Sequence, residues 1–135
     1  MDIEAFKQSF SKANFINELG CKLIDIGNGT CEIHLPIQEK LWQQNGFVHA
    51  GVLATLADHV AGCAAYTVAK ANTKVLTSEF KINLMRPAIG QKLIAKGKVL
   101  KPGKLISVCL SEVYASNDGT EKLVAVALVS ITNVE

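Results

Sequence analysis

The chain has 135 residues, 49% of them hydrophobic, so we expect residues 1–135 to form one domain with a buried core. The net charge is only +2, the lysines are scattered and aromatic residues are few, which excludes the basic footprint of a nucleic-acid-binding protein. The N-terminus lacks an apolar run long enough for a signal peptide or a membrane span, so we expect a cytoplasmic protein with no membrane partner.

The first predicted element is a short amphipathic helix within residues 1–15, which we expect to pack on the larger body of the domain. Its apolar side chains recur at helical spacing: Ile3, Phe6 and Phe10. Residues 21–37 then change to the alternation typical of strands. Asn28-Gly29 divides this stretch into a predicted hairpin, because both turn residues tolerate positive φ.

Residues 49–70 contain no proline and predict one long central helix. One side of this helix carries large apolar residues, and the other carries small ones: Gly51, Ala54, Thr55, Asp58, Ala61, Gly62 and Ala65. Asp58 is the only charge on the small side. A carboxylate there is costly unless it is paired, hydrated or used in chemistry. The helix alone leaves an ordinary ion pair with solvent or a neighbouring subunit as an equal alternative.

Four β-rich segments follow, separated by turn residues such as Pro102-Gly103. They cover residues 74–86, 91–101, 105–115 and 121–132. A helix that is apolar on nearly every side must be enclosed, and the sheet is the element large enough to do so. The order of elements therefore predicts an α+β domain in which an antiparallel sheet curls around one buried helix.

The four cysteines are far apart and show neither a C-x-x-C pair nor a histidine at zinc-finger spacing. We interpret them as reduced core residues and expect no metal site: Cys21, Cys31, Cys63 and Cys109.

The start of the central helix offers groups suited to catalysis. A glycine-containing loop leads to His49, and the first helical turn has N–H groups without helical partners. Such N–H groups can form an oxyanion hole for a thioester carbonyl.

Several motifs, in this order and spacing, make the chain resemble the hot-dog thioesterases of the phenylacetyl-CoA (PaaI) type. They are Gln43-x-x-Gly46-x-x-His49-Ala50-Gly51-Val52, Thr55-Leu56-Ala57-Asp58, Thr77-Ser78-Glu79-Phe80, Leu84-Met85-Arg86-Pro87-Ala88 and Leu100-Lys101-Pro102-Gly103-Lys104. The resemblance covers most of the chain after about residue 15. It implies the hot-dog fold, in which a curved antiparallel sheet wraps around a long helix.

The resemblance also implies catalytic roles. Asp58 would act as general base or as nucleophile, and the Ala50 N–H would stabilise the oxyanion. Gln43 would contact the thioester or the attacking water, and His49 would position the carbonyl or the leaving thiol. Thr77 would orient the nucleophile side of the site. His59 adjoins Asp58, but neighbours on a helix point about 100° apart, so we do not expect the two to act together.

Further residues are expected at the substrate. Gly51 belongs to the oxyanion turn, and Asn45 is the alternative to Gln43 if the loop register shifts. Arg86 is a candidate for a phosphate contact, with a surface ion pair as its alternative, and Lys101 with Lys104 matches the cationic turn that meets the CoA phosphates. Ala50 stands where the family most often has glycine, which leaves less room for the acyl group.

The implied substrate is an acyl-CoA, and no cofactor is expected because CoA is part of that substrate. The resemblance implies a homodimer, or a homotetramer, with the active site at the subunit interface. Two alternatives remain: a hot-dog hydratase or dehydratase, and a non-catalytic acyl-CoA-binding protein.

Overall fold

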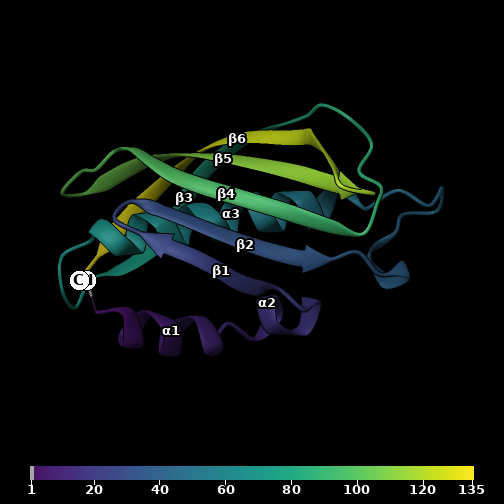
Figure 1. The fold of residues 1–135 in the computed structure, drawn as a ribbon. Helices are drawn as coiled ribbons and strands as arrows, with labels where there is room; N and C mark the ends of the chain where they lie inside the picture. The colour runs from purple at the N-terminus through teal and green to yellow at the C-terminus, as the bar shows by residue number, and fades with distance from the viewer. Residues whose placement is uncertain (1) are drawn as a thin grey trace.

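The computed structural model describes residues 2–135, and Met1, part of the predicted domain, lies outside the described residues (Figure 1). Six strands form one antiparallel sheet in the order β1-β2-β4-β5-β6-β3. The elements are α1 (Ile3–Ser11), α2 (Asn14–Leu19), β1 (Lys22–Gly27), β2 (Thr30–Pro36), a 3-10 turn (Glu39–Leu41), α3 (Ala50–Val68), β3 (Lys74–Leu84), β4 (Lys92–Lys101), β5 (Ile106–Asn117) and β6 (Thr120–Val134). The predicted α+β hot-dog arrangement is confirmed.

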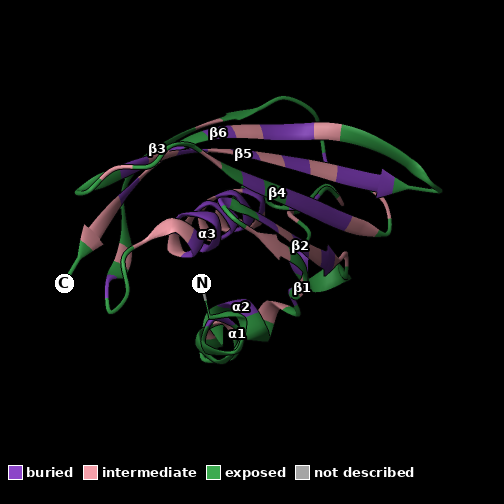
Figure 2. Cartoon of the chain, turned by 60° about the vertical axis from the view of Figure 1, so that its left-hand side comes forward, coloured by how far each residue is buried: buried purple, intermediate pink, exposed green. Residues whose placement is uncertain are grey.

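Helix α3 lies in the concave face of the sheet, with α1 and α2 on its other side (Figure 2). Two small residues paired across β4 and β5, Gly97 and Ser111, let the sheet approach the helix backbone. Ser111 Oγ donates a hydrogen bond of 2.7 Å to the Ala57 carbonyl. A Cβ atom on Gly97 would stand only 2.6 Å from the Val60 carbonyl oxygen. The middle of α3 is therefore fixed against the sheet by backbone contact.

The small-residue side of α3 is divided by this packing. Ala61 and Ala65 are 0% and 1% exposed, because the sheet covers part of the small-residue side of α3 as well as its large apolar side. Ala54, Thr55 and Asp58 remain partly exposed. This part of the small face, together with the exposed Gly51 and the half-buried Gly62, is open to a ligand or another chain.

The N-terminal helix is confirmed as α1, but one predicted contact is wrong. Phe6 is buried against Tyr66, with ring centroids 5.7 Å apart, whereas Ile3 is 47% exposed. Helix α2 was not predicted, because six residues are too few to show a helical period. It ends at Gly20, whose φ of +98° is the left-handed conformation that favours glycine.

Strand β3 forms one edge of the sheet and contains a β-bulge. Its pairing with β6 shifts register between Thr77 and Glu79, which leaves Ser78 as the extra residue. The bulge changes which residues face the core, from Val75 before it to Ile82 after it. Four large apolar residues in or directly after this edge strand are exposed: Leu76, Phe80, Leu84 and Met85.

The predicted hairpin turns are present, with one difference in detail. Gly29 has a φ of +83°, but Asn28 is not among the described residues with positive φ, so only the glycine uses the left-handed region. All four cysteines are buried and free, as predicted. None of the helices within residues 2–135 is long and apolar enough to cross a membrane.

Candidate active site

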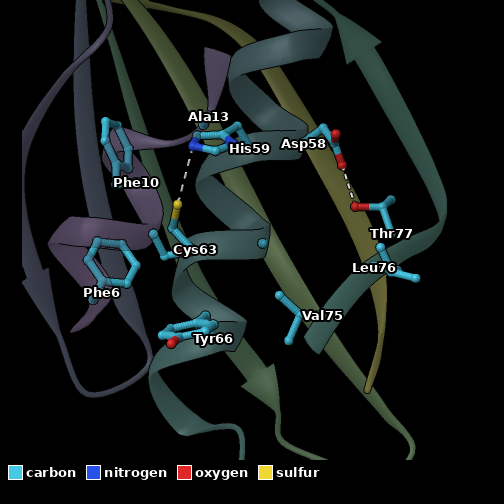
Figure 3. A pocket seen from close by; sticks show the side chains of 12 residues that line it. Phe6, Phe10, Ala13, Asp58, His59, Cys63, Tyr66, Val75, Leu76 and Thr77 are labelled. Atoms are coloured by element: carbon cyan, nitrogen blue, oxygen red, sulfur yellow. Dashed lines mark hydrogen bonds between the residues drawn. The ribbon is translucent and has the colours of Figure 1, made fainter. Parts of the chain in front are cut away.

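The central feature of the site is a hydrogen bond between helix α3 and strand β3. Thr77 Oγ1 donates to Asp58 Oδ1 at 2.6 Å (Figure 3). The distance is typical of a hydroxyl donating to a carboxylate. The bulge at Ser78 follows Thr77 directly, and bulges commonly re-aim side chains beside active sites. The structure thus brings together two residues that the resemblance placed in the same site.

A cavity of about 400 Å³ opens beside this pair, between α1, α3 and β3. It is lined by Phe6, Ser9, Phe10, Ala13, Asp58, His59, Gly62, Cys63, Tyr66, Val75, Leu76 and Thr77. Among these lining residues, Asp58 is the only carboxylate and no lysine or arginine is present. Sequence reasoning did not find this cavity, because its walls come from segments far apart in the chain. The available signal was Gly62, a glycine in the interior of a helix.

His59 points away from Asp58 and toward α1 (Figure 3). Its Nε2 lies 3.5 Å from Cys63 Sγ, and its ring packs edge-on against Phe10 with centroids 5.3 Å apart. Burial lowers the pKa of His59, although the nearby Asp58 carboxylate acts in the opposite direction. His59 is therefore held as a neutral ring that attaches α1 to α3.

The start of α3 is capped by the side chain of His49. Its Nδ1 accepts a hydrogen bond of 2.8 Å from the Gly51 N–H, and its carbonyl accepts one of 2.9 Å from the Val52 N–H. Because Nδ1 accepts, the proton of the neutral ring is on Nε2. No hydrogen-bond partner is found for the Ala50 N–H within residues 2–135. Two donors, His49 Nε2–H and the Ala50 N–H, thus stand at the helix start.

Gln43 closes the loop that leads into α3. Its N–H donates to the Phe47 carbonyl at 2.8 Å, and its side-chain oxygen accepts from the Asn45 N–H. The amide NH₂ of Gln43 then remains as a donor. Gln43, His49 and Ala50 line a second cavity of about 460 Å³, whereas Asn45 is exposed and does not line it.

The Asp58 cavity and the helix-start cavity have no lining residue in common. Asp58 follows Ala50 by eight positions on α3, which corresponds to about 12 Å along the helix axis. An oxyanion donor and the attacking group must both lie about 3 Å from the same carbonyl group. Ala50 and Asp58 of one chain are therefore too far apart to act on the same carbonyl group, and the two cavities beside them are called half-sites below.

The cationic residues expected at the CoA phosphates lie in two separate places. Arg86 lines the helix-start cavity, and its Nη1 donates to the Leu123 carbonyl at 2.8 Å. No carboxylate of the same chain pairs with Arg86 among the described residues. Lys101 at the end of β4 and Lys104 in the turn that follows are both exposed, and neither lines one of the two half-site cavities.

The curved sheet around α3 is the hot-dog fold. The Asp58–Thr77 pair and the donors of His49 and Ala50 at the helix start are the groups that the resemblance to hot-dog thioesterases implies. A family model described as the Thioesterase superfamily matches residues 45–122. The chain belongs to this superfamily and is a thioester hydrolase.

Three known proteins illustrate the relationship. A thioesterase family protein from Silicibacter pomeroyi is 32% identical, with a TM-score of 0.94 and coverage of 96% of this chain and 95% of that one. Human acyl-coenzyme A thioesterase 13 is 27% identical over 124 residues, which cover 90% of this chain and 86% of that protein. The Escherichia coli PaaI protein, from the phenylacetic acid degradation operon, is 20% identical with a TM-score of 0.85. The match covers 96% of this chain and 90% of that one. At this identity it supports the fold alone.

Proposed function

We propose that the protein hydrolyses acyl-CoA thioesters in an active site built by two copies of the chain. Asp58 and Thr77 of one copy would face Gln43, His49 and the Ala50 N–H of the other. The observation that carries this proposal is the separation of the two half-sites by about 12 Å along α3. The similarity to human acyl-coenzyme A thioesterase 13 supports the substrate class.

The proposed chemistry follows from the groups in each half-site. Asp58 either removes a proton from water as the water oxygen bonds to the thioester carbon, or attacks that carbon itself. The carbonyl oxygen becomes an oxyanion, which the Ala50 N–H and the Gln43 amide stabilise. The carbon–sulfur bond then breaks, and the CoA thiolate leaves beside His49 Nε2–H and takes up the proton removed from water. On the nucleophilic route, water then hydrolyses the acyl–Asp58 anhydride, which releases the acid and restores the carboxylate. Because a thioester is an activated acyl donor, the reaction needs no cofactor.

The edge strand β3 is the surface on which we expect the second copy to bind. Its unpaired backbone groups and its exposed apolar side chains (Leu76, Phe80 and Leu84) suit pairing with another strand. The partly exposed Ala54 and Thr55 on α3 leave room for a second helix to approach. A homodimer is the smallest assembly that completes the site, and a homotetramer is the larger assembly that the resemblance implies.

The helix-start cavity suggests where CoA enters. Arg86 lines this cavity beside His49 and Ala50, so we assign it to a CoA phosphate. Gly51 lets the His49 ring fold back, because a Cβ there would lie 3.0 Å from His49 Nδ1. The roles of Asn45, Lys101 and Lys104 at the substrate stay predictions.

A subunit-mixing experiment tests the proposal. Asp58→Asn and Gln43→Ala each damage a different half-site, so each variant alone should release little free thiol from a panel of acyl-CoAs. After the two are unfolded together and refolded, half of the random dimers are mixed and hold one intact site, which gives about a quarter of the parent activity. Mixtures no more active than the separate variants would contradict the shared site. Addition of water to an enoyl-CoA without thiol release would instead indicate a hydratase.

A further inference from the structure

We propose that Ser78 and Thr132 are positioning residues for the hydrolysis. Their two hydroxyl groups hold the bulge of β3 at Ser78 and thereby keep the Thr77 hydroxyl directed at Asp58. The inference rests on the proposed function, because Asp58 is the group that the two hydroxyls serve. It goes beyond that function, since neither Ser78 nor Thr132 lines a half-site cavity.

The side chains of Thr77 and Ser78 form hydrogen bonds on opposite faces of β3. On the concave face, Thr77 Oγ1 donates to Asp58 Oδ1 at 2.6 Å. Ser78 Oγ instead shares a hydrogen bond with Thr132 Oγ1 of β6. Ile131 is 0% exposed in the core, and successive residues of a strand face opposite sides, so Thr132 faces outward. The bulge is therefore held from both faces of the sheet.

The hydroxyl pair selects one of two possible positions for the bulge. In the structure Thr77 lies opposite Ile131, and Ser78 is the extra residue that follows. If the bulge moved back by one residue, Thr77 would become the extra residue and Ser78 would lie opposite Ile131. Ser78 would then face inward, away from Thr132, and Thr77 would lose its approach to the carboxylate on α3. The bond between Ser78 and Thr132 thus belongs only to the register that suits catalysis.

Thr132 is a firm anchor for this edge of the sheet. Within the described residues β3 pairs only with β6, whereas Thr132 of β6 is paired with β3 on one side and β5 on the other. The next residue, Asn133, donates from its N–H to the Leu105 carbonyl at 2.8 Å and from its side-chain amide to the Gly103 carbonyl at 2.8 Å. The end of β6 is therefore fixed independently of β3, so Ser78 is held by a residue that does not shift with its own strand.

The test measures kcat and KM for thiol release by Ser78→Ala and Thr132→Val. The substrate is whichever of acetyl-, hexanoyl-, palmitoyl- and benzoyl-CoA the parent hydrolyses fastest. Each variant removes one of the two hydroxyls, and valine keeps the shape of threonine. In both variants kcat should fall about three- to tenfold, as expected when one hydrogen bond is lost. KM should change by less than about twofold, because neither residue lines a half-site cavity.

Two matched variants separate the hydroxyl contact from general damage to the sheet. Thr132→Ser keeps the hydroxyl and should retain the parental kcat. Ser130→Ala removes a hydroxyl from the same strand and the same face, but Ser130 lies opposite Glu79 and not opposite the bulge residue. It should also leave kcat unchanged. The Tm and the oligomeric state are measured on all variants, and parental values would place the losses in folded, assembled protein.

The Thr77→Val background distinguishes positioning from an ordinary structural contact. In that background Ser78→Ala should lower kcat by less than about twofold further, since the hydroxyl that Ser78 positions is already absent. Equal losses in both backgrounds would overturn the proposal. So would a parental kcat in folded Ser78→Ala or Thr132→Val, or a kcat of Thr132→Ser as low as that of Thr132→Val, while thioester hydrolysis by the parent would stand. A parent that releases thiol from none of the four acyl-CoAs would overturn the proposed function and this role together.

Discussion

Replacing Asp58 with asparagine isolates the chemistry of the carboxylate from its structural role. The side chain keeps its size, and its amide oxygen can still accept the hydrogen bond that Thr77 Oγ1 donates at 2.6 Å. What is lost is the ability to accept a proton from water or to attack carbon. We therefore expect a folded protein with a specific loss of hydrolysis.

The size of the loss follows from the surroundings of Asp58. Among the described residues that line its cavity, no other carboxylate can replace it as a base, and His59 is turned toward Cys63. General-base catalysis contributes about 10²–10⁴ in rate, so kcat/KM should fall by that factor, equivalent to about 2.7–5.4 kcal/mol. The stability should change by about 1 kcal/mol or less, because a charge-assisted hydrogen bond becomes a neutral one.

The assay follows free thiol with a chromogenic disulfide reagent while the variant and the parent hydrolyse the same acyl-CoA. Thermal unfolding and the oligomeric state are measured on the same samples. A loss of activity with parental Tm and assembly supports the assignment. Parental activity in a well-folded Asp58→Asn protein would refute it, since no carboxylate would then be required at this position.

Four further outcomes are expected. Thr77→Val should lower kcat about tenfold with little change in KM, since one hydrogen bond to Asp58 is removed, and an unchanged kcat would argue against an orienting role. Gly97→Ala should lower the free energy of unfolding in denaturant by about 1–3 kcal/mol, because the added Cβ would lie 2.6 Å from the Val60 carbonyl oxygen. An unchanged free energy of unfolding would contradict this packing. The pKa of His59 in the folded protein lies below its unfolded value of about 6.5, so the unfolded chain binds the proton first as the pH falls. The folded state should therefore lose stability below about pH 6.5. The variant His59→Gln lacks this group, so its Tm should fall less than that of the parent between about pH 7 and pH 5. Burial raises the pKa of Cys21 and Cys109 to about 11, so these thiols should react with the disulfide reagent only after unfolding, and a rapid reaction of the native protein would refute their burial.

The elements with strong periodicity were predictable from the sequence. The central helix was expected over residues 49–70 and is found at Ala50–Val68, because its apolar pattern and its lack of proline favour no other structure. The strands agree with the predicted segments to within about two residues, since their turns carry glycine or proline. Helix α2 and the bulge at Ser78 were missed, because neither leaves a periodic signal in so few residues.

The candidate site was predictable in its residue types but not in its arrangement. The resemblance named both Asp58 and Thr77, and the hydrogen bond between them agrees with that pairing. The separation of Ala50 from Asp58 follows from the rise of a helix and could have been worked out beforehand. The contact between Phe10 and His59 could not have been predicted, because it joins segments almost 50 residues apart that no local pattern connects.

The bulge in β3 makes the length of this strand more sensitive to change than its composition. Before Ser78 the odd-numbered Val75 and Thr77 turn toward α3, and after it the even-numbered Ile82 packs on the core. Deletion of one residue between them would remove the bulge and restore regular alternation with Thr77 and Ile82 still on one face, whereas one added residue would turn either Thr77 or Ile82 outward. Substitutions in this stretch can therefore accumulate during evolution, whereas a one-residue insertion would separate the carboxylate from its hydroxyl partner or remove Ile82 from the core.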